Sequence, residues 1–162
     1  MENNVHHPKR LMYASWGGLA AGVVFGIIIG LAGMLPMVAK LVGSSSIIVG
    51  FVVNLVVSVV VAVAFVMLFG KRLTSYARGA VWGLGYGFVW WILGPAILMP
   101  ILLGMGAQLT VAGITEAWPV KLGSHLVYGL LVGVLYVWFM NSSKGGVESQ
   151  PSGTVPPSGG NV

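Results

Sequence analysis

Two polar side chains stand out inside the apolar part of this 162-residue sequence, and both have the chemistry to do more than pack. Asn54 and His125 fall in the outer halves of two predicted membrane spans. Each can form an interhelical hydrogen bond or hold a water molecule, which is the simpler interpretation. A neutral imidazole can also be an axial ligand to haem or to a magnesium-containing pigment. His6 and His7 precede the first span, so a second axial histidine would come from another protomer.

Aromatic residues form the second unusual feature. Trp82, Tyr86 and Trp90 recur at every fourth position of the third span, and Trp90 and Trp91 fall near its middle instead of at a membrane interface. Residues four apart share one helix face. The stripe therefore predicts either helix packing or, as an alternative, a surface on which a flat quinone, carotenoid or haem stacks.

The groups that most enzymes and transporters use are missing from the sequence. The central portions of the spans contain no Asp, Glu, Lys or Arg, which counts against ion-driven transport. We find no phosphate-binding loop, nucleophile elbow or zinc-binding histidine pair, and there is no cysteine. We therefore expect a protein without enzymatic activity and without a metal site. The net charge of +5 is divided among helix ends, so no nucleic-acid partner is expected.

Composition indicates that these residues are carried by membrane helices. The chain is 57% hydrophobic and 7% charged, whereas soluble domains average about 25% charged residues. A span needs about 20 apolar residues. Four stretches are long enough, and they run from Leu11 to Leu35, Ser46 to Phe69, Gly79 to Leu103 and Leu122 to Met140. The predicted fold class is an all-α polytopic bundle in the lipid bilayer.

The basic residues predict the orientation of the four spans. With an even number of spans, both termini and the middle loop share one side. That side holds Lys9, Arg10, Lys71, Arg72, Arg78 and Lys144, and the other holds Lys40 and Lys121. The excess of positive charge predicts that both termini are cytoplasmic, in a bacterial cytoplasmic (inner) membrane.

An internal repeat relates the two halves of the sequence. Gly18, Gly22 and Gly26 match Gly79, Gly83 and Gly87 at an offset of 61, and Asn54, Ser58 and Ala62 match His125, Gly129 and Gly133 at an offset of 71. We therefore predict two similar hairpins, over 11–70 and 71–140. A short N-terminal tail (1–10) precedes them, a longer outer loop (104–121) interrupts the second, and a disordered cytoplasmic tail (141–162) follows. Pro95 and Pro100 should kink the third span.

The small residues recur once per helical turn and predict close contact between helices. The glycines in these stripes are Gly18, Gly22, Gly26, Gly30, Gly79, Gly83, Gly87, Gly129 and Gly133. Lipid supplies no hydrophobic driving force, so backbone packing at small residues holds membrane helices together. We expect all four stripes to face one tight interior, with Asn54, Ser58 and His125 as its polar members. Dimerisation through an outward stripe is the alternative, and the tight packing disfavours a large cavity.

The segments "GAVWGLGYG", "LMPILLGMG" and "GSHLVYGLLVGVLYVWF" resemble uncharacterised bacterial inner-membrane proteins of the YagU type, mainly over residues 79–140. The resemblance implies a polytopic protein of the cytoplasmic membrane and directs attention to His125. The sequence departs from that type at the Gly-Ser-His spelling, in length and in its lack of internal acidic residues.

From these observations we expect a non-enzymatic accessory or assembly subunit that packs against a larger membrane complex or against itself. The alternative is a small channel or carrier, or a haem- or pigment-binding membrane protein that uses His125 and the tryptophans.

Overall fold

The structure is a computed structural model that describes residues 7–112 and 118–145. Its long helices are α1 (His7–Leu31), α3 (Ile47–Phe69), α4 (Tyr76–Ile92) and α7 (Trp118–Gly145). Two short elements, α2 (Leu35–Ala39) and η1 (Lys40–Val42), join α1 to α3. Within these described residues, four helical segments are long and apolar enough to cross a membrane, so the predicted all-α, four-span fold is confirmed.

The ends of the first and last spans differ from the predicted boundaries. Helix α1 begins at His7, four residues before the predicted start of the span, so the end of the predicted N-terminal tail is helical. Helix α7 begins at Trp118 and continues to Gly145, past the predicted boundary at Met140. Three segments lie outside the described residues: 1–6, 146–162 and the part of the outer loop that contains Glu116 (113–117).

The third span is a broken helix. Helix α4 gives way to a π-helical turn, η2 (Leu93–Leu98), and then to α5 (Met99–Leu102). Pro100 has no N–H to donate to the carbonyl of Ala96, four residues earlier. The backbone N–H of Gln108 donates to that oxygen instead, at 2.7 Å. Wider turns of this kind relieve a helix where a proline interrupts its hydrogen bonds.

Within the first hairpin, the glycine face of α1 packs directly on the small and polar face of α3. A Cβ placed on Gly18 would lie 2.5 Å from the Cβ of Ala62, and one on Gly22 would lie 2.6 Å from the Cβ of Ser58. Real Cβ atoms do not approach other atoms closer than 3.0 Å. Only glycine therefore permits this separation of the two helices.

In the second hairpin the contact between α4 and α7 is closer still, because glycine faces glycine. A Cβ on Gly83 would overlap the carbonyl of Gly129, and one on Gly79 would lie 2.6 Å from the carbonyl oxygen of Gly133. Gly87 meets the carbonyl of His125 in the same way. In the first hairpin a Cβ on Gly26 would likewise lie 2.7 Å from Nδ2 of Asn54, so the three contacts of each hairpin match at the offsets of 61 and 71 residues.

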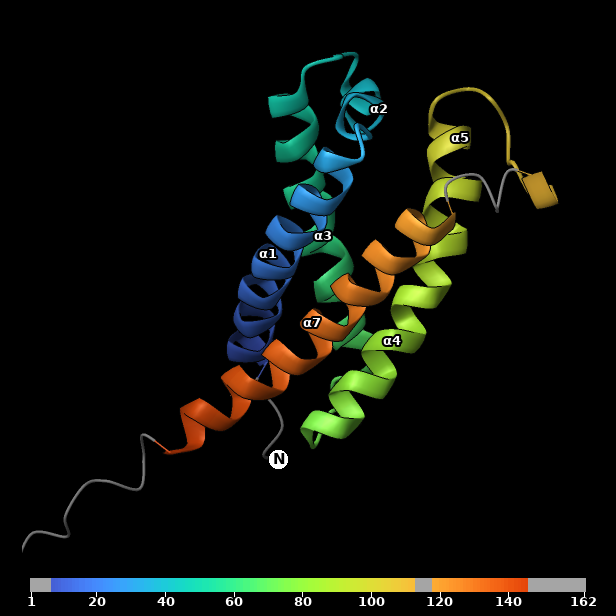
Figure 1. Cartoon of the computed structure of the whole chain (residues 1–162). Coiled ribbons are helices and arrows are strands. Elements are labelled where there is room, and N and C mark those ends of the chain that lie inside the picture. The colour runs from blue at the N-terminus through green and yellow to red at the C-terminus, as the bar shows by residue number, and fades with distance from the viewer. Residues whose placement is uncertain (1–6, 113–117, 146–162) are drawn as a thin grey trace, which may run out of the picture.

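The arrangement differs from the common interior that we expected. Each stripe is used inside its own hairpin, and the two hairpins meet mainly where α7 crosses α1 (Figure 1). Tyr86 donates to the carbonyl of Val61 at 2.9 Å, and Tyr128 donates to the carbonyl of Ser58. Arg10 donates from Nε to the hydroxyl of Tyr136 at 2.9 Å, near the start of α1. Gly17 of α1 also lies against α7, where a Cβ would be 3.9 Å from the amide nitrogen of Tyr136, but the hydrogen bonds between the hairpins come from side chains.

Candidate functional site

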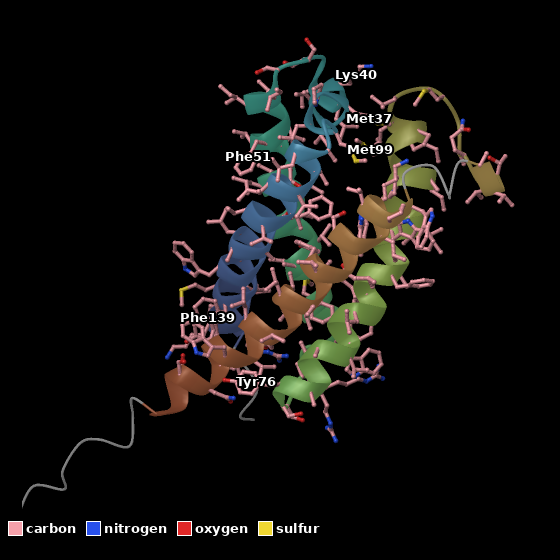
Figure 2. The ribbon with its side chains drawn as sticks, in the orientation of Figure 1. Met37, Lys40, Phe51, Tyr76, Met99 and Phe139 are labelled. Carbon is pink, nitrogen blue, oxygen red and sulfur yellow. The ribbon has the colours of Figure 1, made fainter. Side chains whose placement is uncertain are left out.

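A cavity of about 820 Å³ lies between the two hairpins, toward the end of the bundle that carries α2 and α5. Figure 2 shows Met37 of α2 and Met99 of α5 in the gap between the hairpins at that end, and both residues line the cavity. A large cavity was disfavoured by the tight packing that the glycines predict. It exists because the striped glycines close each hairpin on itself, so that the space between the hairpins at this end is left to side chains.

Most of the cavity wall is apolar. Its aliphatic and methionine residues come from both hairpins, and they include Ile29, Leu41, Val57, Val61, Leu98 and Met105. Several wall residues are also strongly exposed, such as Val56, Val60 and Leu102, which are 60%, 63% and 67% exposed. In a bilayer, residues exposed in this way face acyl chains, so the cavity is open to the lipid.

The polar groups of the cavity wall are few, and most are already engaged. Asn54 is buried and donates from Nδ2 to the carbonyl of Gly22 at 2.9 Å. The hydroxyl of Tyr128 donates to the carbonyl of Ser58, and the hydroxyl of Ser124 donates to the carbonyl of Lys121 at 3.0 Å. These groups stabilise helix pairs or helix turns.

His125 lies on the cavity wall with one ring nitrogen fixed. Its Nδ1 is 2.6 Å from the carbonyl oxygen of Lys121. A carbonyl can only accept, so Nδ1 carries the proton, and in the neutral ring Nε2 has a lone pair. The ring of Phe25 meets the imidazole edge-on, with centroids 4.9 Å apart. The backbone and the Phe25 ring together fix both the tautomer and the tilt of this side chain.

The Nε2 atom of His125 lies beside Gly94 of the π-helical turn. A Cβ on Gly94 would be 3.5 Å from Nε2, and no other atom outside its own turn and chain neighbours would come within 4 Å of it. In the described part of the chain Nε2 has no hydrogen-bond partner, and this atom is not fully buried. The lone pair is therefore reachable from the cavity, past a residue without a side chain.

The two polar residues that the repeat makes equivalent do not contact each other. Asn54 and His125 belong to different hairpins and line the same cavity. Trp90 also lines it, whereas Trp91 is not among the wall residues and packs against Phe88, with centroids 5.5 Å apart. Gly94 was missed by the sequence analysis, although its position next to Pro95 in an interrupted helix is a visible signal.

The other aromatic residues of the stripe lie away from the His125 ring, beside the turn between α3 and α4. Trp82 stacks on Phe69, with centroids 4.9 Å apart, and the guanidinium of Arg72 lies over its ring at 5.1 Å. Tyr86 contacts Phe65, with centroids 4.9 Å apart, and continues the cluster toward the cavity. This arrangement serves helix packing, as the simpler interpretation of the stripe predicts.

No protein-family model, curated protein or solved structure gives a significant match. The resemblance to YagU-type membrane proteins stays a prediction, and the functional argument rests on the cavity.

Proposed function

We propose that this integral membrane protein binds one largely apolar molecule in the cavity between its hairpins, without catalysing a reaction. The observation that carries the proposal is the cavity itself, at about 820 Å³. Sites for small organic ligands are concave, mostly apolar, and about 300–1,000 Å³ in volume. The opening toward lipid favours a molecule that is dissolved in the bilayer and reaches the cavity from the side.

The packing below the cavity supports binding in preference to conduction through the bundle. Large side chains fill the bundle between the cavity and the end that carries Arg10. Phe65, Val132, Tyr136 and Val137 are each less than 2% exposed. A channel or carrier would need these residues to separate, whereas a binding protein uses them as the floor of its site.

An accessory or assembly role, which the glycine stripes first suggested, has less support. The stripes are occupied within the chain, because Gly22 contacts Ser58 and Gly83 contacts Gly129. A partner subunit would have to use another face of the bundle. Stoichiometric co-purification with a membrane complex would support this role, and we keep it as a separate proposal.

For the cellular setting we propose a bacterial cytoplasmic membrane with both termini in the cytoplasm. The start of α1 and the end of α7 lie at the same end of the bundle, as this topology requires (Figure 1). The cavity then lies in the outer half of the membrane.

The test is to purify the protein in mild detergent, extract it and identify bound molecules by mass spectrometry. Gly94→Leu places a side chain in the cavity, and Gly85→Leu is the matched control, because a Cβ on Gly85 of α4 meets nothing within 4 Å. We expect a near-stoichiometric molecule in the wild type and in Gly85→Leu that is lost from Gly94→Leu. Extracts that contain only bulk membrane lipid, in equal amounts for all three proteins, would overturn the proposal.

A further inference from the structure

We propose that Nε2 of His125 is the polar anchor of the cavity and that the bound molecule carries a hydroxyl group on an apolar body. This inference rests on the proposed binding function and specifies the chemistry of its ligand. It depends on three features of the wall. The lone pair of Nε2 has a fixed direction, the neighbouring Gly94 has no side chain, and the nearby polar groups of Asn54 and Tyr128 already form hydrogen bonds within the protein.

The lone pair is fixed because the backbone selects the tautomer. With Nδ1 donating to the carbonyl of Lys121 at 2.6 Å, Nε2 of the neutral ring can only accept a hydrogen bond. The same arrangement, in which one ring nitrogen is held by a carbonyl, orients histidines that bind metal ions through the other nitrogen. The edge-on ring of Phe25 keeps the imidazole from rotating away.

Gly94 leaves the lone pair open. At this position in η2 a side chain would crowd Nε2, since even a Cβ would be 3.5 Å from the nitrogen, in van der Waals contact with it. The π-helical turn brings Gly94 opposite α7, and Pro95 and Ala96 continue the turn. The proline-interrupted helix therefore gives a ligand access to the imidazole.

The ligand must supply the donor, because Nε2 of the neutral ring can only accept a hydrogen bond. The amide of Asn54 already donates to the carbonyl of Gly22, and the hydroxyl of Tyr128 already donates to the carbonyl of Ser58. An apolar wall disfavours a charged ligand, since burying an unpaired charge is costly. Lys121 is the charged wall residue in the described part of the chain, and a lysine side chain is long enough to keep its ammonium at the membrane surface. A neutral hydroxyl on a hydrocarbon body satisfies each of these conditions.

The experiment compares farnesol with farnesyl methyl ether, in which a methyl group replaces the hydroxyl hydrogen and so removes the donor. Equal amounts of the two compete for the protein in nanodiscs, and native mass spectrometry gives the ratio of bound alcohol to bound ether. We expect the wild type to prefer the alcohol by about 5- to 10-fold, the worth of one hydrogen bond in an apolar site. His125→Phe keeps a ring but has no lone pair, and its ratio should fall to about 1.

A second variant tests the same contact without removing the imidazole. Gly94→Ala covers Nε2 at ordinary van der Waals distance, so its ratio should also fall, while Gly85→Ala should keep the wild-type ratio. If the wild type binds both probes equally, the anchor is wrong and the binding function stands. If the wild type binds neither probe and carries no native ligand, the binding function itself fails. A Soret band that is lost in His125→Phe would identify a metal macrocycle and overturn the hydroxyl class.

Discussion

The Nδ1 atom of His125 lies 2.6 Å from the carbonyl oxygen of Lys121, one turn earlier on α7. The hydrogen bond to this backbone carbonyl thus determines which nitrogen of the imidazole faces the cavity. We expect the neutral ring to carry its proton on Nδ1. Nitrogen-15 NMR of labelled histidine, in a variant with His6→Gln and His7→Gln, would measure this directly. A ring protonated on Nε2 would contradict the geometry.

The α4–α7 contact should not tolerate even one methyl group. In Gly83→Ala the added Cβ meets the carbonyl of Gly129, and both helices must move apart. Overpacking of this kind costs about 1–3 kcal/mol. Denaturant titration in detergent should show that loss in the free energy of unfolding. Gly85→Ala is the control on the same helix, and it should be as stable as the wild type or slightly more so, because alanine favours helix. Equal stabilities for Gly83→Ala and Gly85→Ala would mean that the helices are not in contact.

The first hairpin should behave differently, because there the glycine faces a side chain. Gly18→Ala places its Cβ 2.5 Å from that of Ala62, so removing the latter methyl relieves the clash. We expect Gly18→Ala to lower the melting temperature and the double variant Gly18→Ala/Ala62→Gly to recover most of the loss. The recovery is incomplete, since the carbonyl oxygen of Ser58 lies 3.1 Å from the same Cβ position. A double variant less stable than the single one would show that the two positions do not face each other.

The tyrosines that cross between the hairpins should stabilise the bundle through their hydroxyls. Tyr86→Phe and Tyr128→Phe each remove a donor to a carbonyl of α3, and each should cost about 1 kcal/mol of unfolding free energy. Tyr76→Phe is the control, because Tyr76 is 47% exposed at the start of α4. If all three variants unfold alike, the hydroxyls do not join the hairpins.

The proposed orientation can be tested on single-cysteine variants, since the sequence contains no cysteine. Ser45 lies in the α2–α3 connection and Ser142 in the last turns of α7, and both are exposed. A membrane-impermeant maleimide should label Ser45→Cys in intact spheroplasts, and Ser142→Cys only after the membrane is opened. The reverse pattern would place the termini outside.

The sequence predicts the spans well because each helix satisfies its own backbone hydrogen bonds in lipid. Length and hydropathy are then sufficient, and the four segments lie where the apolar stretches are. The broken third span also follows from Pro100, which cannot donate to the carbonyl of Ala96. The partner of that carbonyl, the backbone N–H of Gln108, could not be predicted, because the contact depends on how the following loop folds back.

By itself, therefore, the sequence determined the four membrane helices and the faces on which they approach closely. The tertiary structure decided which face meets which. A glycine face such as that of Gly22 or Gly83 fits any small face equally well, so the stripes do not specify their partners. Their pairing inside each hairpin leaves the hairpins joined mainly by side chains, and a cavity remains between them. No local pattern encodes a volume bounded by helices from both hairpins, and for that reason the setting of His125 became visible only in three dimensions.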